Sequence, residues 1–222
     1  MIEPRSEVTC IDYIEFMKSL PDKSVGLALL DPEYGINAGA KKSYHPNALT
    51  QYAPKKWDSK IPDAEYFEQV FRVSVNQIIW GGNYFTEFLP PQPKWIVWDK
   101  MQPEGIDQAM FELAWQSNPK KQAKIYRQSA QSNCNKVANN KAAAQQYIRI
   151  HATQKPVDMY KWCLYNYANE GDLIMDCGVG SQSSRIAAYD MGFDFIGCDN
   201  DPDMIEKGNK RFENFKAQLK MF

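Results

Sequence analysis

An acid, a proline and an aromatic residue stand directly behind the first apolar run of the chain. The run is Val25–Leu30, and its composition predicts a short buried strand. Asp31, Pro32 and Tyr34 follow at once. In open α/β sheets, chemistry takes place in the crevice at the carboxyl ends of the strands. A carboxylate and an aromatic ring in this place predict a catalytic segment.

A second group of glycines and acids lies about 145 residues further along. A strand predicted at 172–176 ends on Asp176 and runs into a glycine turn at 177–181, which opens a helix. A strand predicted at 193–198 is followed by Asp199, 21 residues after Gly178. Strand, glycine turn, helix, strand and acid are the plan of a nucleoside-cofactor site.

The periodicity of apolar residues predicts the elements that must position these groups. Further strands are predicted at 77–80 and 94–98, with weaker candidates at 112–115 and 123–126 that would form an antiparallel edge. Helices are predicted at 11–20, from the cap Asp63 to about 75, from Pro156 at the first helical position to about 167, at 183–191 and at 202–215. Alternating strands and helices predict an α/β fold with a mostly parallel sheet.

Composition limits the class of protein. A chain of 222 residues suits one α/β domain, and a hydrophobic content of 44% is enough for a sizeable core. No apolar run is long enough to span a membrane, and no signal peptide is expected. The five cysteines are widely spaced, which is typical of reduced thiols in a cytoplasmic protein. With only His45 and His151, the chain does not favour a histidine-based metal site.

Positive charge is concentrated in two segments, although the net charge of the chain is only −1. Segment 37–57 contains four bases and segment 116–150 contains seven, and neither contains an Asp or Glu. Removing those eleven charges leaves −12 on the rest of the chain. This uneven distribution of charge indicates a polyanionic partner. The candidate nucleic-acid contacts are Lys41, Lys42, Lys55, Lys56, Lys120, Lys121, Lys124 and Arg127.

Six motifs in order resemble one enzyme family, the S-adenosylmethionine-dependent DNA amino-methyltransferases. Residues 31–36 match D-P-P-Y-G-I with one change, and 151–156 match H-P-T-Q-K-P with one change. Residues 176–181 loosely match D-P-F-x-G-S, and 199–202 follow the ribose-binding strand. Residues 12–22 resemble the first helix and turn of the family, and 79–85 with 98–100 resemble segments of phage-type members. The order, with the catalytic motif before the cofactor loop, is the β arrangement.

The resemblance implies a Rossmann-like methyltransferase fold and a role for each motif. Asp31 and the Pro32 carbonyl would each accept one N–H of an exocyclic amine, and Tyr34 would stack on a base flipped out of the duplex. The implied S-adenosylmethionine contacts are Asp12, Thr153, Lys155, Asp176, Gly178, Gly180, Ser181 and Asp199. Among these, Lys155 and Thr153 would meet the methionine carboxylate and Asp199 the ribose.

The resemblance also implies a division of the chain. A single methyltransferase domain would cover 1–222, with a mobile loop at 37–62 after the catalytic strand. A short basic insertion at 116–150 would recognise the DNA target. The sequence leaves open the recognition site, whether the chain acts alone or as a homodimer, and whether its role is restriction-modification, protection or phage modification.

Three residues depart from the family pattern. Glu33 replaces the second proline of D-P-P-Y, which predicts an extra carboxylate near the target amine and slow methylation. Gly178 replaces a phenylalanine that walls the cofactor pocket, and Gln182 replaces a glycine.

The function that the sequence favours is methylation of adenine N6 in DNA, because by resemblance an Asp-initiated motif accompanies adenine and a Ser-initiated one cytosine N4. Three alternatives stay open: a catalytically impaired DNA-binding relative, an N4-cytosine methyltransferase, and an enzyme acting on RNA or protein. A dinucleotide-dependent oxidoreductase would use Asp199 but leaves 31–34 and 151–156 without a role.

Overall fold

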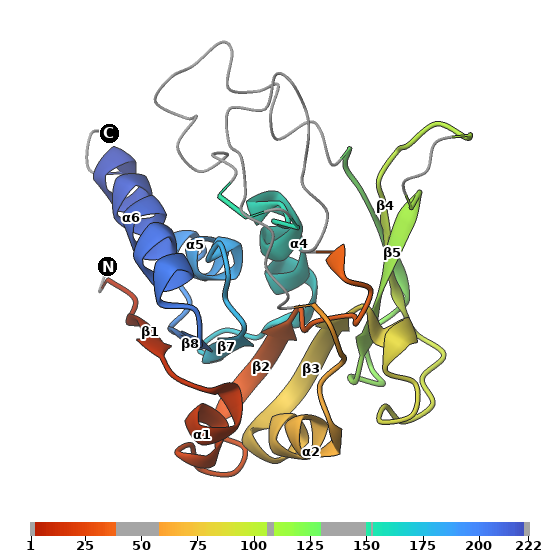
Figure 1. The fold of residues 1–222 in the computed structure, drawn as a ribbon, viewed down its shortest axis with the longest axis horizontal. Helices are drawn as coiled ribbons and strands as arrows, with labels where there is room; N and C mark the ends of the chain where they lie inside the picture. Colours follow the sequence, from red (N-terminus) through yellow and green to blue (C-terminus); the bar gives the residue numbers. More distant parts are fainter. Residues whose placement is uncertain (1–2, 39–57, 106–108, 130–149, 152, 220–222) are drawn as a thin grey trace.

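A computed structural model describes residues 3–38, 58–105, 109–129, 150–151 and 153–219. These residues form an eight-stranded sheet with the order β1-β8-β7-β2-β3-β5-β4-β6 (Figure 1). The strands are β1 Ser6–Cys10, β2 Val25–Leu30, β3 Ser74–Trp80, β4 Ile96–Asp99, β5 Phe111–Gln116, β6 Lys124–Arg127, β7 Ile174–Cys177 and β8 Phe195–Asp199. Two neighbours in the centre, β7 and β2, belong to the two distant motifs that the sequence singles out.

Of these strands only β5 runs against the others. It pairs antiparallel with both β3 and β4, whereas β6 pairs parallel with β4 at the end of the sheet. The prediction that both weak candidates form an antiparallel edge is therefore wrong for β6. Strand β1 was not predicted, because its side chains are mostly exposed and its sequence carries no burial signal.

Helices cover both faces of the sheet (Figure 1). On one face lie α1, Tyr13–Lys18, and α2, Ala64–Val73. The other face is covered by α4, Val157–Tyr167, α5, Ser183–Asp190, and α6, Pro202–Leu219. A 3-10 turn, η2, Gly82–Tyr84, follows β3. None of the helices in the described ranges is long and apolar enough to cross a membrane.

Local signals set the helix boundaries. The Asp12 side chain accepts hydrogen bonds from Ile14 N and Glu15 N at the start of α1, and the Asp63 side chain accepts one from Tyr66 N at the start of α2. Pro156 is the extended cap before α4 rather than its first helical residue, since its ψ is 138°. The helix therefore begins one residue later than predicted.

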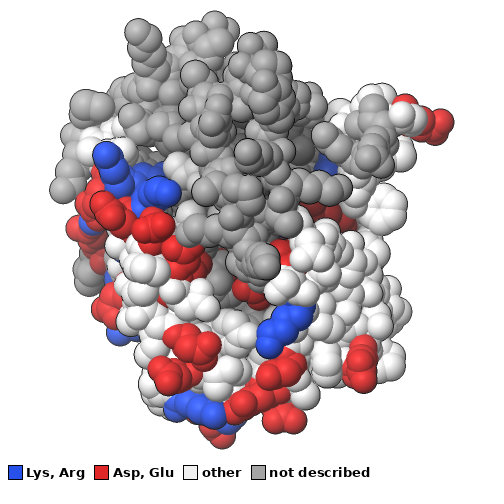
Figure 2. Space-filling model, viewed as in Figure 1, with Lys and Arg blue, Asp and Glu red and all other residues white. Residues whose placement is uncertain are grey.

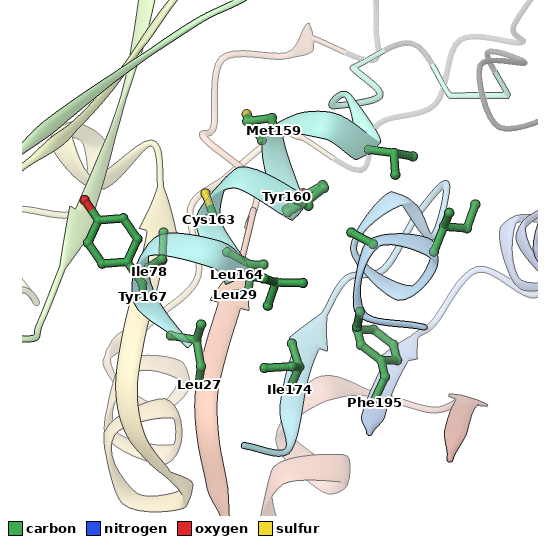
Figure 3. Packing of buried hydrophobic residues seen from close by; sticks show 14 of the residues in the cluster. Leu27, Leu29, Ile78, Met159, Tyr160, Cys163, Leu164, Tyr167, Ile174 and Phe195 are labelled. Carbon is green, nitrogen blue, oxygen red and sulfur yellow. The ribbon is translucent and has the colours of Figure 1, made fainter. Parts of the chain in front are cut away.

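The central strands are buried on both faces, which explains their continuous apolar runs. Figure 3 shows Leu27 and Leu29 of β2 beneath Cys163 and Leu164 of α4. On the opposite face Leu30 packs with the residues of α1 and α2. At about 25 cal/mol per Å² of apolar surface, each such fully buried leucine stabilises the fold by about 1.5–3 kcal/mol.

The sheet gathers the predicted site at one edge. Strands β2, β7 and β8 are parallel, and Cys177 pairs with Cys198, so their carboxyl ends lie together. Because β5 is antiparallel and Ala114 pairs with Trp80, the first residues of β5 reach this same edge. Glu112, which pairs with Trp98 of β4, is thereby brought to the same edge as Asp31. We call this side of the sheet the carboxyl edge.

Candidate active site

The Asp31 carboxylate lies just after β2 and receives two donors. Tyr34 Oη donates to Asp31 Oδ1 at 2.7 Å, and Lys155 Nζ donates to the same oxygen at 2.5 Å. Within the described ranges both bonds reach Oδ1, which leaves Oδ2 for another donor. The Asp31 side chain is 21% exposed, so an incoming group can approach it.

The ammonium group of Lys155 lies in a buried cluster of charges rather than in solvent. Its side chain is 5% exposed, and Nζ lies 3.3 Å from Glu112 Oε2 as well as against Asp31. Glu112 Oε1 is in turn 2.5 Å from Lys100 Nζ. Four alternating charges thus run from Lys100 to Asp31. The cluster crosses from β4 and β5 to the start of α4, so only the folded sheet assembles it.

Both inner members of the cluster are charged at neutral pH. Burial alone would lower the pKa of Lys155, but Asp31 and Glu112 raise it above its ordinary value. Burial would raise the pKa of Glu112, and the neighbouring Lys155 and Lys100 lower it. In the structure Lys155 contacts Asp31 and Glu112, and its contact with a cofactor carboxylate stays a prediction.

The ring of Tyr34 is fixed on several sides. Its hydroxyl bonds Asp31, and its ring stacks on Tyr84 with centroids 5.0 Å apart and planes inclined by 13°. Gly81 has a φ of +70°, and a Cβ there would lie 2.2 Å from Tyr34 Cε1. A glycine is therefore required at the end of β3. The outer ring of this stack is Tyr84, which is 43% exposed.

A second carboxylate, Asp176, lies at the end of β7 and is 2% exposed. Ser184 Oγ donates to its Oδ2 at 2.5 Å. Its Oδ1 is buried and has no hydrogen-bond partner among the described residues. Burial, ahead of the nearby charges, raises the pKa of Asp176 to about 7. An unpartnered buried carboxylate oxygen is a fitting contact for an ammonium group.

The glycine turn beside Asp176 is open. Gly178 has a φ of +89°, and a Cβ built there would meet nothing within 4 Å. Gly180 N donates to Asp199 Oδ2 at 2.9 Å, and Asp201 N donates to Asp199 Oδ1 at 2.9 Å. Two backbone donors thus hold the Asp199 carboxylate at the end of β8, with lone pairs left on both oxygens.

Two other residues of the turn have clear structural roles. Gln182 has a φ of +58°, a conformation suited to the glycine that it replaces. Its Oε1 accepts a hydrogen bond from Arg185 at 2.8 Å, and its Nε2 donates to Asn209 at 3.1 Å. Ser181 is buried beside it, with its carbonyl bonded to Arg211.

Glu33 is a half-buried acid close to several other acids. Burial raises the pKa of Glu33, and among the charges that raise it further Asp199 and Asp58 act more strongly than Asp31. Because Asp31 is among these charges, the expectation of an extra carboxylate near the target amine stays a prediction.

The remaining predicted cofactor contacts are spread around this edge. Asp12 uses Oδ1 to cap α1. Thr153 is exposed, and its Oγ1 lies 3.1 Å from His151 Nδ1. His151 lies close enough to Asp199 to lower the pKa of that acid, although burial raises it overall.

The structure separates the predicted DNA contacts. Strand β5 leaves the carboxyl edge, so Lys120 and Lys121 in the turn after Gln116 lie at the opposite edge. Lys124 opens β6 at that same far end and donates to Asn166 Oδ1 at 2.6 Å. Arg127 ends β6 at the carboxyl edge, 3.3 Å from Asp99. Lys41, Lys42, Lys55 and Lys56 lie outside the described residues, as does most of the predicted loop 37–62.

Part of the predicted recognition insertion, 116–150, belongs to the sheet. Its first residue ends β5, and residues 124–127 form β6. Residues 130–149 lie outside the described residues. An insertion that recognises DNA would therefore begin after β6 rather than at 116.

A family model described as DNA methylase matches residues 29–210. The chain belongs to the N6/N4 DNA methylase family. It is 21% identical to the type II methyltransferase M1.MboII of Moraxella bovis over 255 residues, covering 91% of this chain and 94% of the relative. It is 23% identical to M2.MboI of the same organism, covering 93% of this chain and 87% of the relative.

Solved methylase structures share the fold of this methylase. The M1.HpyAVI complex with S-adenosylmethionine has a TM-score of 0.58 at 15% identity, covering 92% of this chain and 98% of that one. TTHA0409 of Thermus thermophilus, complexed with S-adenosyl-L-methionine, has a TM-score of 0.57 at 16% identity, covering 95% of this chain and 94% of that one. The cytosine-N4-specific PvuII DNA methyltransferase has a TM-score of 0.60 at 11% identity, covering 97% of this chain and 92% of that one. The predicted Rossmann-like methyltransferase fold is confirmed.

Three residues of the methylase site were missed by sequence analysis: Glu112, Lys100 and Tyr84. Glu112 stands in a strand that carried only a weak signal, and nothing in its neighbours marks it. Lys100 directly follows a strand end, and Tyr84 stands in the segment that resembles phage-type members. Their positions in the sequence were therefore visible, but not their contacts with the catalytic segment.

Proposed function

We propose that this methylase transfers a methyl group from S-adenosylmethionine to the N6 amine of adenine in DNA. The observation that carries the proposal is the Asp31 carboxylate, held at Oδ1 by two donors and left with Oδ2 for an amine. Family membership supports DNA as the acceptor. An Asp-initiated motif favours adenine over cytosine, by the resemblance described above.

The residues of the catalytic segment localise the lone pair of the amine. Asp31 Oδ2 and the Pro32 carbonyl each accept one N–H, which draws the nitrogen out of conjugation with the ring and stabilises its developing positive charge. S-adenosylmethionine supplies an electrophilic methyl group, and the S–C bond breaks with its electron pair on sulfur as the C–N bond forms. The excess proton on nitrogen passes to the Asp31 carboxylate and then to solvent.

The glycine turn and its two acids fit the methyl donor. The buried, unpartnered Asp176 Oδ1 would take the methionine ammonium group, and Asp199 would accept the ribose hydroxyls. The space above Gly178 allows close approach of the backbone. Gly180 and Ser181 would shape the turn around the methyl donor, and Thr153 and the remaining oxygen of Asp12 would be further contacts to it.

The flipped adenine would meet an aromatic wall. Tyr34 is held by Asp31 and covered by Tyr84, so the exposed ring of Tyr84 extends the stacking surface for the base. Stacking of a base on an aromatic side chain contributes about 1–3 kcal/mol.

The test is incubation of the protein with methyl-labelled S-adenosylmethionine and unmodified DNA, followed by separation of the nucleosides. Labelled N6-methyladenine supports the proposal. Label in N4-methylcytosine would assign the other branch of the family. Binding of DNA without any label in it would favour the catalytically impaired relative.

A further inference from the structure

The lysine on Asp31 is placed to set the charge of that carboxylate. Lys155 Nζ lies 2.5 Å from Asp31 Oδ1 and 3.3 Å from Glu112 Oε2. The two carboxylate oxygens are therefore at most 5.8 Å apart, the sum of those two distances, with the ammonium group between them. Two carboxylates so close in a buried site repel, and without a cation one of them takes up a proton.

The other groups that face Asp31 cannot replace this cation. Tyr34 donates a neutral hydroxyl, and Tyr160 of α4 stays neutral because burial raises its pKa far above the physiological range. Asp176 of β7 and Glu33 are acids whose charge opposes ionisation of Asp31. Lys100 lies on the far side of Glu112. Among these neighbours Lys155 supplies the direct positive charge.

The direction of the contact also matters. Because Lys155 and Tyr34 both donate to Oδ1, they fix the carboxylate plane and leave Oδ2 toward the amine that the proposed function requires. Glu112 in turn holds Lys155 from the other side, and Lys100 balances Glu112. The lysine is thus restrained by carboxylates on two elements.

We propose that Lys155 is a positioning residue that holds Asp31 as an oriented carboxylate. The negative charge of Glu112 restrains Lys155 but opposes the ionisation of Asp31. The inference rests on the proposed role of Asp31 as acceptor of the amine. It assigns Lys155 to the catalytic carboxylate and not to the methionine carboxylate.

Opposite shifts in the ionisation of Asp31 test the inference. In Lys155→Met, Asp31 faces Glu112 without a cation, so the midpoint of its ionisation moves to higher pH. In Glu112→Gln a like charge is removed while Lys155 remains, so the titration moves down. The double variant Lys155→Met with Glu112→Gln falls between the two. Carbon NMR of labelled aspartate carboxyls measures each midpoint, with the Asp31 signal assigned by its loss in Asp31→Asn.

The same variants are then followed by single-turnover methylation as a function of pH. Lys155→Met should be about 10²–10³-fold slower, because the carboxylate that stabilises charge at the reacting amine is no longer held in place. Lys155→Arg should keep most of the rate. Lys161→Met is the matched control, since Lys161 of α4 forms its 2.5 Å ion pair with Asp190 at the end of α5 and not with a member of the cluster.

Two results would overturn the inference. If Lys155→Met weakens S-adenosylhomocysteine binding tenfold or more in calorimetry and leaves the Asp31 titration unmoved, the lysine serves the cofactor. If both single variants shift the titration in the same direction or not at all while remaining folded by circular dichroism, the cluster is only structural. If Lys155→Met does not fold, the other two variants decide. The inference then requires a downward shift of the Asp31 midpoint in Glu112→Gln and the native midpoint in Lys155→Arg.

These outcomes are separate from those of the proposed function. The NMR titration needs neither DNA nor methyl donor, so it stands even if no DNA is methylated. A product other than N6-methyladenine would change the base assignment and leave the predicted order of the midpoints untouched.

Discussion

Two carboxylates at the carboxyl edge, the half-buried Asp31 and the buried Asp176, have different neighbours. Asp31 shares its Oδ1 with an ammonium group and a hydroxyl. Asp176 has one hydroxyl donor and an oxygen without a partner among the described residues, and burial raises its pKa to about 7. At the residue scale, therefore, the proposed function gives Asp31 the amine of the base and Asp176 the methionine ammonium group.

The raised pKa of Asp176 predicts that binding of the methyl donor depends on pH. The methionine ammonium binds the ionised carboxylate, so affinity for S-adenosylhomocysteine should fall about tenfold per unit below pH 7 and level off above it. Calorimetry across this range measures the effect. In Asp176→Asn the affinity should be weak and independent of pH, and a flat profile in the native protein would contradict the assignment.

The same pKa predicts a stability effect of definite sign. The folded-state pKa of Asp176 is raised from 3.8 to about 7, so the folded state holds a proton that the unfolded state has lost in between. Stability conferred by the protonated form is then lost as pH rises from about 4 to about 7. Without ligand, Asp176→Asn should lose less Tm between pH 5 and 8 than the native protein. An equal loss in thermal denaturation would argue against a buried, neutral Asp176.

At the scale of elements, the site depends on how strand ends and turns meet. The turn after β3 is the tightest point, because Gly81 lies directly against the ring of Tyr34. The antiparallel course of β5 brings Glu112 to the same edge. Both contacts join segments that are far apart in the sequence.

Gly81→Ala is predicted to damage both the fold and the activity. A Cβ would clash with Tyr34, and a φ of +70° disfavours alanine, so unfolding free energy should fall by at least about 2 kcal/mol. Gly171→Ala is the control, since its φ is +80° but nothing lies within 4 Å of its Cβ, and it should cost only about 1 kcal/mol. Denaturant titration and single-turnover rates compare them. Equal stability loss and equal rates would mean that Tyr34 does not need this glycine.

Local patterns predicted much of this arrangement. The apolar run 25–30, the glycine turn 177–181 and the acid at 199 led to a mostly parallel sheet with the site at its strand ends, because buried parallel strands have continuous apolar sequences. The exposed β1 and the direction of β6 could not be predicted, since pairing of edge strands depends on partners remote in the chain. For the same reason the sequence did not reveal the contact of Lys155 with Glu112, which exists only after β5 and the start of α4 meet.

The whole molecule carries an uneven charge. The described residues hold 18 of the 26 bases and 26 of the 27 acids, a formal charge of −8. Figure 2 shows acidic side chains along the left and lower margins of this face, with few basic ones between them. Approach of DNA to the carboxyl edge therefore requires bases near that edge. Ala38 and Asp58, which flank the segment with Lys41, Lys42, Lys55 and Lys56, lie close to Gly35 at this edge.

The salt dependence of DNA binding should distinguish the two groups of lysines. Replacing Lys41, Lys42, Lys55 and Lys56 by alanine should flatten the slope of log affinity against log salt by up to about 3.6, at about 0.9 for each phosphate that a lysine no longer neutralises. Replacing Lys120 and Lys121, at the opposite edge, should change it by less than about 0.5. Fluorescence anisotropy with duplex DNA measures both slopes. The reverse order would place the DNA on the far edge of the sheet.

The central claim is that Asp31 performs the transfer while the glycine turn separately binds the methyl donor. The most direct measurement pairs single-turnover methylation of DNA by Asp31→Ala with its affinity for S-adenosylhomocysteine. The account predicts a rate lowered by at least about 10³-fold, since the charged acceptor for the amine is removed, with affinity changed by less than about twofold. A variant that still methylates adenine at near-native rate, or one that loses binding along with turnover, would contradict it.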